Sequence, residues 1–219
     1  MLKGAIFDFD GTLFDSMFVW DGSSAKYLRS IGIEPDPDTN EQVGRMSLLQ
    51  SARYFRKKYA IPYTVDEIMD GINRTVEDLY FYKVQPKDGV IEFLKELKAR
   101  GVTLCIATAT DRYQIDAALR RCGMDGLFSE IFTCSEVGHG KDEPIIFRRA
   151  REFMGTPKAA TVVFEDAAHA AKTAKADGFK VAAVYDPSEE RQEELRAAAD
   201  HFIKSFKDTE QFWKFAYGL

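Results

Sequence analysis

Two aspartates separated by one residue, Asp8 and Asp10, lie at the end of a mainly apolar run, residues 5–9. The run predicts a buried parallel strand, and Gly11 permits the sharp turn by which the chain leaves the sheet. Two carboxylates this close repel each other, and a cation between them relieves the repulsion. Mg²⁺ is the simplest such cation because it prefers oxygen ligands, and a carboxylate beside it is placed to attack phosphorus. The alternative is a solvated turn that carries two acids.

A hydroxyl and an ammonium group follow where other elements are expected to end or begin. Thr108 closes an expected strand at residues 102–107, and a hydroxyl at such a strand end points into the ligand crevice of an open α/β sheet. Lys141 lies just before an expected helix whose first turn contains Pro144. Both side chains have the chemistry to bind a phosphoryl group. Taken alone, Thr108 is equally an ordinary strand-end or N-cap residue, and Lys141 a solvated lysine.

A second pair of acids, Glu165 and Asp166, follows the expected strand at residues 161–164. The carboxyl ends of parallel strands meet at one edge of a sheet, so this pair supplies a second side for a cation site. Asp166 could instead, or in addition, cap the alanine-rich helix expected at residues 167–176. His169, in the first turns of that helix, is expected to be a neutral packing or surface residue.

The placement of these residues depends on an alternation of strands and helices in the second half of the chain. Buried strands are expected at residues 102–107, 130–134, 161–164 and 180–184, with a shorter one near 201–203. Apolar residues recur at helical spacing between the strands, as in segments 90–97 and 115–122. This alternation predicts the α/β class, with a doubly wound parallel sheet and helices on both faces.

Residues 16–84 break the alternation. Three amphipathic helical patterns occur there without a convincing strand, and Gly and Pro residues separate them. We therefore expect two domains: an α/β core from residues 1–15 and 85–219, and an inserted helical bundle from residues 16–84. Because the insertion begins just beyond the aspartate pair, it is expected to act as a lid over the site.

Composition disfavours several other classes of protein. The chain has 219 residues and a net charge of −5, whereas nucleic-acid-binding proteins are usually basic. No apolar run reaches the length of a membrane span, and the start of the chain has no signal-peptide pattern. Three widely spaced cysteines indicate reduced thiols rather than disulfides. We expect a cytoplasmic protein without nucleic-acid or membrane partners, either a monomer or a weak homodimer.

Four motifs, in this order, resemble those of the haloacid dehalogenase superfamily of aspartyl phosphohydrolases. They are FDFDGTLFDS, IATAT, GKDEP as a GK-x-x-P element, and VVFEDA. The resemblance covers essentially the whole chain, and the first motif is the most specific. It implies a Rossmann-like core, and the helical insertion resembles the type-1 cap of the superfamily. The pattern is most similar to that of phosphoglycolate-phosphatase-like and β-phosphoglucomutase-like members.

The resemblance implies a role for each aspartate of the first motif. Asp8 would be the nucleophile and form an aspartyl-phosphate. Asp10 would protonate the leaving oxygen and then accept a proton from water. Dehalogenases of the superfamily lack the second aspartate of this motif, so Asp10 favours phosphoryl transfer.

Two sets of binding residues are also implied by the resemblance. Mg²⁺ would be held by Asp8, the backbone carbonyl of Asp10, and Asp166. Glu165 would be a further ligand or a neighbour of the ligands. The phosphoryl group would lie against Gly11, Thr108, Ala109 and Lys141.

Two residues of the insertion are candidates for substrate recognition. Arg45 follows Gly44 where related caps place a substrate-contacting loop, and arginine suits an anionic or hydroxyl-rich group. A solvated helix arginine is the alternative. Trp20 stands where many β-phosphoglucomutase-like members carry a histidine, which weakens a mutase assignment. Trp20 either lines the substrate pocket or packs in the core of the cap.

These observations favour a Mg²⁺-dependent phosphatase of a small phosphorylated metabolite. A phosphomutase shares the first half-reaction, but a substrate hydroxyl rather than water accepts the phosphoryl group. A non-catalytic binding protein on the same fold is disfavoured by the intact acidic, hydroxyl and lysine residues. A phosphonate hydrolase is disfavoured because no cap lysine is an evident Schiff-base residue. The sequence does not identify the substrate.

Replacing Trp20 or Arg45 by alanine is expected to change the ranking of substrates in a screen of phosphorylated metabolites. Turnover of a small activated aryl phosphate should survive better, because remote contacts contribute binding energy only to the natural substrate. Kinetics of Trp20→Ala and Arg45→Ala on both substrate types test this expectation. An equal loss on both, in a protein that remains folded, would remove the specificity role.

Overall fold

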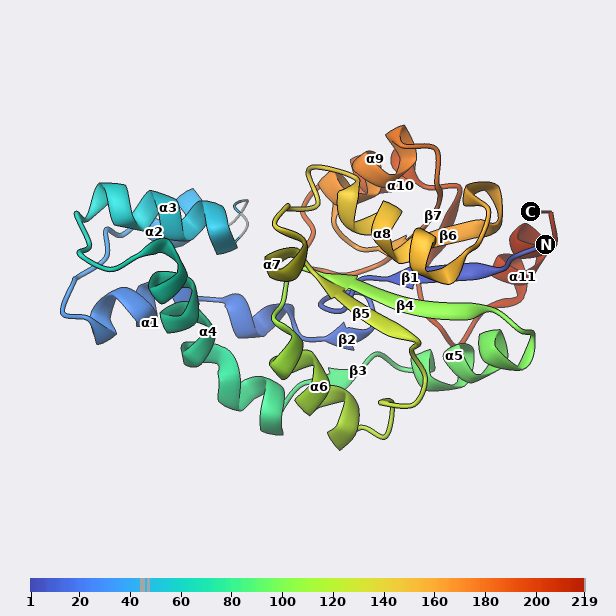
Figure 1. Ribbon diagram of the computed structural model, residues 1–219, viewed down its shortest axis with the longest axis horizontal. Helices are drawn as coiled ribbons and strands as arrows, with labels where there is room; N and C mark the ends of the chain where they lie inside the picture. The colour runs from blue at the N-terminus through green and yellow to red at the C-terminus, as the bar shows by residue number, and fades with distance from the viewer. Residues whose placement is uncertain (44–45, 47, 219) are drawn as a thin grey trace. The chain divides into compact units, whose positions relative to one another are not determined.

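The chain, described by a computed structural model over residues 1–43, 46 and 48–218, folds into two compact units (Figure 1). The core unit comprises Met1–Ser16 and Val84–Leu219, and the helical unit is Met17–Lys83. The chain leaves the core unit soon after its first strand and re-enters it at Val84. The core unit is therefore built from two segments that are far apart in the sequence.

A six-stranded sheet forms the centre of the core unit, and neighbouring strands in it are parallel. In order across the sheet, the strands are β5 (Glu130–Thr133), β4 (Thr103–Thr108), β1 (Gly4–Phe7), β6 (Thr161–Glu165), β7 (Lys180–Val184) and β8 (His201–Ile203). The predicted parallel sheet is confirmed, with strand limits that differ from the expected ones by at most two residues. Strand β1 is interior because later strands add first on one side of it and then on the other.

Helices cover both faces of this sheet (Figure 1). One face carries α8 (Ile145–Met154), α9 (Ala168–Ala176) and α10 (Gln192–Ala198), and the other carries α5 (Val90–Ala99), α6 (Arg112–Arg121) and α11 (Glu210–Tyr217). Two short elements, α7 (Cys134–Val137) and η2 (Lys158–Ala160), lie in the connections. On the first face, Ile6 and Val163 of the sheet share a buried cluster with Phe147 and Ala171 of the helices. The alternation of side chains along each strand produces the two apolar faces.

Aromatic side chains form the core beneath the second face. Phe7 of β1 and Phe164 of β6 stack with ring centroids 4.1 Å apart. Phe93 of α5 and Phe212 of α11 meet edge to face at 5.0 Å, and Phe212 lies 5.4 Å from Phe164. All four side chains are buried. Their packing fixes the two strands whose ends carry the candidate acids.

The helical unit has its own core. Its elements are η1 (Met17–Trp20), α1 (Ser23–Ser30), α2 (Thr39–Val43), α3 (Leu48–Lys58) and α4 (Val65–Tyr82). Leu28, Phe55 and Ile72 bring three of these helices into one buried cluster. Gly71 of α4 lets Tyr27 pack closely against this helix, since a Cβ at position 71 would fall 2.2 Å from a ring carbon of Tyr27. The role of this unit as a lid stays a prediction.

A short antiparallel pair joins the two segments of the core unit where the chain leaves and re-enters it. The pair consists of β2 (Phe14–Asp15) and β3 (Gln85–Pro86). Just beyond it, the backbone amide of Lys87 donates to the carbonyl of Leu13 at 2.8 Å. The sequence does not predict this pair, because two residues are too few to show a period.

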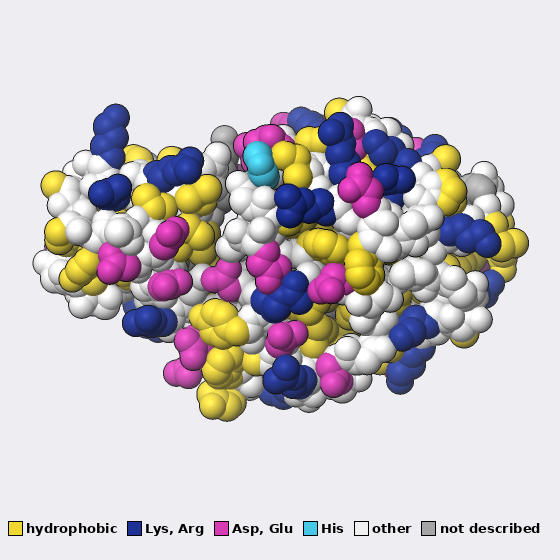
Figure 2. Space-filling view, in the orientation of Figure 1, with side chains coloured by type: hydrophobic (Ala, Val, Ile, Leu, Met, Phe, Trp, Pro, Cys, Tyr) yellow, Lys and Arg dark blue, Asp and Glu magenta, His cyan; other side chains and the backbone are white. Residues whose placement is uncertain are grey.

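The surface is mixed in charge on the face of the core unit that Figure 2 shows. Lys and Arg side chains are interspersed there with Asp and Glu side chains. This distribution contrasts with the continuous basic stripe typical of nucleic-acid-binding surfaces. Among the described residues, the helices are too short or too polar to cross a bilayer.

Removal of the Phe212 side chain is expected to destabilise the core unit. Phe212→Ala should lower the free energy of unfolding by about 3–5 kcal/mol, because it leaves a cavity beside Phe93 and Phe164. Tyr217→Ala on the same helix is the control, since Tyr217 is 61% exposed. Denaturant unfolding of both variants measures the difference, and equal losses would contradict the assigned core.

Candidate active site

The polar residues that the sequence singles out lie at one edge of the sheet, where the carboxyl ends of β1, β4 and β6 meet. Asp8 directly follows β1, Thr108 is the last residue of β4, and Glu165 is the last residue of β6. Asp166 comes next in the chain, and Lys141 lies between α7 and α8. The order of the strands reverses at β1, and ligands of open α/β sheets bind at this point of the edge.

Lys141 joins two of the acids at this edge. Its Nζ lies 2.7 Å from Oδ1 of Asp8 and 2.6 Å from Oε1 of Glu165. One carboxylate oxygen from each of Asp8, Glu165 and Asp166 lies within 4.8 Å of the others. We name these three residues the acidic cluster. Its members differ in access to solvent, because the side chain of Asp8 is 14% exposed and that of Glu165 is fully buried.

Burial and mutual repulsion perturb the titration of these groups. Burial raises the pKa of the Glu165 carboxyl against the opposing attraction of the Lys141 ammonium. Burial, and then the charges of Asp8 and Glu165, raise the pKa of Asp166 well above its usual value. Burial alone would lower the pKa of Lys141, but Asp8 and Glu165 outweigh it and raise that pKa, so the ammonium keeps its charge. The cluster therefore contains more carboxyl groups than Lys141 can neutralise.

The donor atoms of the cluster fit a divalent cation. Oε2 of Glu165 is buried and has no hydrogen-bond partner among the described residues. A buried oxygen without a partner costs free energy, and a cation supplies the missing interaction. Carboxylate oxygens are also the ligands that hard divalent cations prefer. Asp8, Glu165 and Asp166 are therefore the residues that could hold such an ion.

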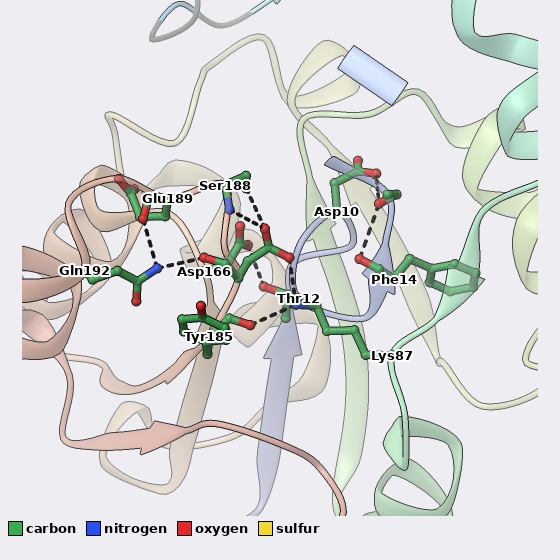
Figure 3. A network of polar contacts seen from close by, with 11 residues as sticks. Asp10, Thr12, Phe14, Lys87, Asp166, Tyr185, Ser188, Glu189 and Gln192 are labelled. Atoms are coloured by element: carbon green, nitrogen blue, oxygen red, sulfur yellow. Dashed lines mark hydrogen bonds and ion pairs between the residues drawn. The ribbon is translucent and has the colours of Figure 1, made fainter. Parts of the chain in front are cut away.

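The turn after β1 lies directly against Asp166. Gly11 has a φ of +71°, and a Cβ there would fall 2.2 Å from Oδ2 of Asp166. Glycine permits both this backbone conformation and this close approach. The hydroxyl of Thr12 donates to Oδ1 of Asp166 at 2.7 Å (Figure 3). Asp166 does not cap α9, so that alternative is wrong: the N-cap residue is Ala167.

Asp10 is held by two hydroxyl groups. Its Oδ1 accepts from Ser16 at 2.6 Å, and its Oδ2 accepts from Thr110 at 2.5 Å. All three side chains are buried. Sequence reasoning misses Ser16, Thr110 and also Thr12, because single hydroxyl residues are common. The available signal is that all three lie inside the FDFDGTLFDS and IATAT motifs.

The other predicted residues of the core unit lie at the same edge with different exposure. Thr108 is buried, and its hydroxyl accepts from the amide of Thr110 at 3.1 Å. Ala109, between them, is exposed. His169 is exposed in the first turn of α9. Thr108 and Ala109 directly precede Thr110, whose hydroxyl contacts Asp10, so the end of β4 lies beside the first motif.

The two predicted residues of the insertion belong to the helical unit. Trp20 is partly buried against the cluster of that unit and meets the ring of Tyr80 edge to face at 6.3 Å. This packing fits the core-packing alternative for Trp20. Arg45 lies outside the residues that the structure describes.

A family model matches most of the chain. The family described as haloacid dehalogenase-like hydrolase matches residues 5–184. The matched range begins in β1 and ends with β7, so it contains the acidic cluster, Lys141, Thr108 and the whole helical unit.

Individual proteins are similar over different shares of the chain. Protein CbbY of Rhodobacter capsulatus is 34% identical over 130 residues, which are 58% of this chain and 56% of that protein. Phosphoglycolate phosphatase of Synechococcus elongatus is 26% identical over 214 residues, which are 94% of this chain and 95% of that protein. The crystal structure of CbbY from Rhodobacter sphaeroides in complex with phosphate has a TM-score of 0.83 at 21% identity, covering 96% of this chain and 97% of the other. The last comparison shows a shared fold.

A methyl group at position 11 is expected to disrupt the turn and displace Asp166. Gly11→Ala should cost about 1–2 kcal/mol for the left-handed backbone and more for the clash with the carboxylate. Gly123→Ala is the matched control, since Gly123 has a φ of +66° and nothing within 4 Å of the added Cβ. Denaturant unfolding gives both losses. A loss for Gly11→Ala no greater than that for the control would contradict the close approach.

Proposed function

We propose that this chain, which belongs to the haloacid dehalogenase-like hydrolase family, hydrolyses a small phosphorylated metabolite. The reaction would pass through a phosphoenzyme on Asp8. One observation carries the proposal: Asp8 lies at the reversal point of the sheet with the ammonium of Lys141 2.7 Å from its carboxylate. Its side chain is 14% exposed, whereas Glu165 is fully buried and Asp166 is 3% exposed. Of the acidic cluster, Asp8 is therefore the carboxylate most open to a substrate. A carboxylate so placed can act as a nucleophile.

The reaction proceeds in two displacements. In the first, an oxygen of Asp8 bonds to phosphorus while the bond from phosphorus to the leaving oxygen breaks. Asp10 gives its proton to that oxygen, which departs as an alcohol. In the second, water attacks phosphorus, gives a proton to Asp10, and the bond between Asp8 and phosphorus breaks. Inorganic phosphate leaves, and both carboxyl groups return to their starting forms.

Ser16 and Thr110 hold Asp10 ready for its two roles. A hydroxyl can donate or accept a hydrogen bond, so the pair accommodates the Asp10 carboxyl with or without its proton. Both hydroxyls are buried, which limits the positions open to the carboxyl. A proton-transfer group held in this way stays close to the orientation that proton transfer requires.

The remaining residues bind charge. Mg²⁺ would be held by Asp8, the backbone carbonyl of Asp10, and Asp166, with Glu165 beside or among these ligands. When bound, the ion supplies positive charge that offsets repulsion between these acids and the phosphate dianion. The substrate phosphoryl group lies against the ammonium of Lys141, the hydroxyl of Thr108, and the backbone at Gly11 and Ala109.

The helical unit would supply the substrate contacts that the chemistry itself does not need. It is inserted between the β1 turn and β3, and both of its connections enter the core unit through the paired strands β2 and β3. Closure of such an insertion would exclude water while the leaving oxygen is protonated. Synechococcus elongatus phosphoglycolate phosphatase, which matches nearly the whole chain, supports a small phosphorylated substrate.

A screen of phosphorylated metabolites, read by phosphate release in the presence of Mg²⁺, tests the function. Activity on at least one small phosphate monoester is expected, with loss in chelator and return on adding Mg²⁺. Asp166→Ala should abolish the activity or raise the Mg²⁺ requirement. Full turnover in chelator would contradict the proposed requirement for Mg²⁺. Product analysis with a hexose phosphate separates a phosphatase from a phosphomutase.

The two aspartates are expected to fail differently. Asp8→Asn removes the nucleophile, so turnover should stop and no phosphoenzyme should form. Asp10→Asn keeps the nucleophile but loses proton transfer, a loss of roughly 10²–10⁴-fold in turnover. A substrate with a good leaving group should still phosphorylate the Asp10→Asn protein slowly. Steady-state kinetics and the intact mass of acid-quenched protein measure both effects, and near-normal turnover by Asp8→Asn would contradict the mechanism.

A further inference from the structure

The helix that follows Asp166 begins without a local cap. Helix α9 starts at Ala168, and its N-cap residue is Ala167, whose methyl side chain offers no hydrogen-bond acceptor. Ala167 nevertheless has φ −88° and ψ 123°, the extended conformation in which Ser or Asp commonly caps a helix. The amide of Ala168 instead donates to Oε2 of Glu189 at 2.7 Å. A carboxylate 21 residues away in the chain therefore binds the first amide of the helix, one of the donors that a helix start leaves without a partner.

Glu189 is itself held firmly. Its Oε1 accepts from the backbone amide of Arg191 at 2.8 Å and from Nε of the same residue at 3.1 Å. The side chain is 8% exposed. With both oxygens engaged, the carboxylate has little freedom, and its charge lies at the positive end of the α9 dipole.

The loop that carries Glu189 is fastened to the core unit (Figure 3). Asp186, 1% exposed, accepts from Nζ of Lys87 at 2.7 Å and from the hydroxyl of Ser188 at 2.6 Å. The side-chain amide of Gln192 donates to the backbone carbonyls of Asp186 and Glu189. These bonds make residues 185–192 a hydrogen-bonded support at the end of β7.

Asp166 is consequently fixed on two sides. The hydroxyl of Thr12 holds its carboxylate, and Glu189 holds the backbone two residues further on. The support and the Thr12 turn are also joined, because Lys87 binds Asp186 through its side chain and the carbonyl of Leu13 through its amide. A shift of the α9 start would move the Asp166 backbone directly.

We infer that Glu189 is a positioning residue for Asp166, acting through the first amide of α9 to hold that carboxylate where a divalent cation would be bound. The inference rests on the proposed function, in which Asp166 is a metal ligand. Groups that orient metal ligands without touching the metal typically change metal affinity by 10- to 100-fold when they are removed. Because Glu189 acts through the backbone, the lower end of that range is expected.

Calorimetric titration of MgCl₂ into the folded protein tests the inference without any assay of activity. Glu189→Ala should weaken Mg²⁺ binding about tenfold. Glu190→Ala is the charge-matched control, because Glu190 is the next residue in the loop and is exposed; its affinity should stay at the value of the unsubstituted protein. Glu189→Gln keeps an oxygen for the Ala168 amide but loses the charge, so about a threefold loss is expected.

A local cap should rescue the substitution. Ala167→Ser in the Glu189→Ala background supplies an oxygen to the same helix end from the residue that already has the N-cap conformation. Recovery of most of the Mg²⁺ affinity supports the capping route. Restored thermal stability without restored affinity would overturn it, since it would show that a stabilised start of α9 does not position Asp166.

The outcomes separate this inference from the function on which it rests. Unchanged Mg²⁺ affinity in folded Glu189→Ala protein overturns the inference alone. If the Glu189→Ala protein does not fold, unchanged Mg²⁺ affinity in folded Glu189→Gln protein overturns the inference instead. Absence of Mg²⁺ binding by the unsubstituted protein would overturn the proposed metal site and the inference together.

Discussion

A surplus of closely spaced carboxyl groups at one edge of the sheet is the constraint on which the rest of the site depends. Three carboxyl groups converge there, and Lys141 brings one positive charge into contact with two of them. Burial raises the pKa of both Glu165 and Asp166, so the arrangement is unfavourable for the ionised acids by themselves. In the proposed function, a divalent cation would offset this repulsion and also the repulsion between the acids and the phosphate dianion of the substrate. The clustering that is costly in the isolated protein would thus favour the binding of a cation.

The fold tolerates this cost because each member of the site is anchored elsewhere. Phe7 and Phe164 stack in the core directly before the two acidic strand ends, so the strands cannot separate to relieve repulsion. Gly11 lets the turn approach Asp166 within contact distance, and Thr12 adds a hydrogen bond. The loop after β7 completes the support through Glu189. Packing and hydrogen bonds thus oppose electrostatic repulsion at one place in the molecule.

The sequence predicts the parts of this arrangement that arise within short segments. Apolar runs that end in acids locate β1 and β6, and the alternation of elements predicts the parallel sheet, which the structure confirms. The contacts of Asp10 with Thr110 and of Ala168 with Glu189 join residues 100 and 21 positions apart, and they depend on loop conformations that leave no periodic pattern. Such contacts become visible only when the loops are placed on the folded sheet.

The central claim is that Asp8, and not water, makes the first bond to phosphorus. The stereochemical course at phosphorus tests it most directly, with a phosphorothioate ester whose two non-bridging oxygens are different isotopes, hydrolysed in water that carries the third isotope, so that the thiophosphate product is chiral. Each in-line displacement inverts the configuration. Transfer to Asp8 followed by transfer to water therefore predicts overall retention. Overall inversion would show a single direct attack by water and would contradict the account.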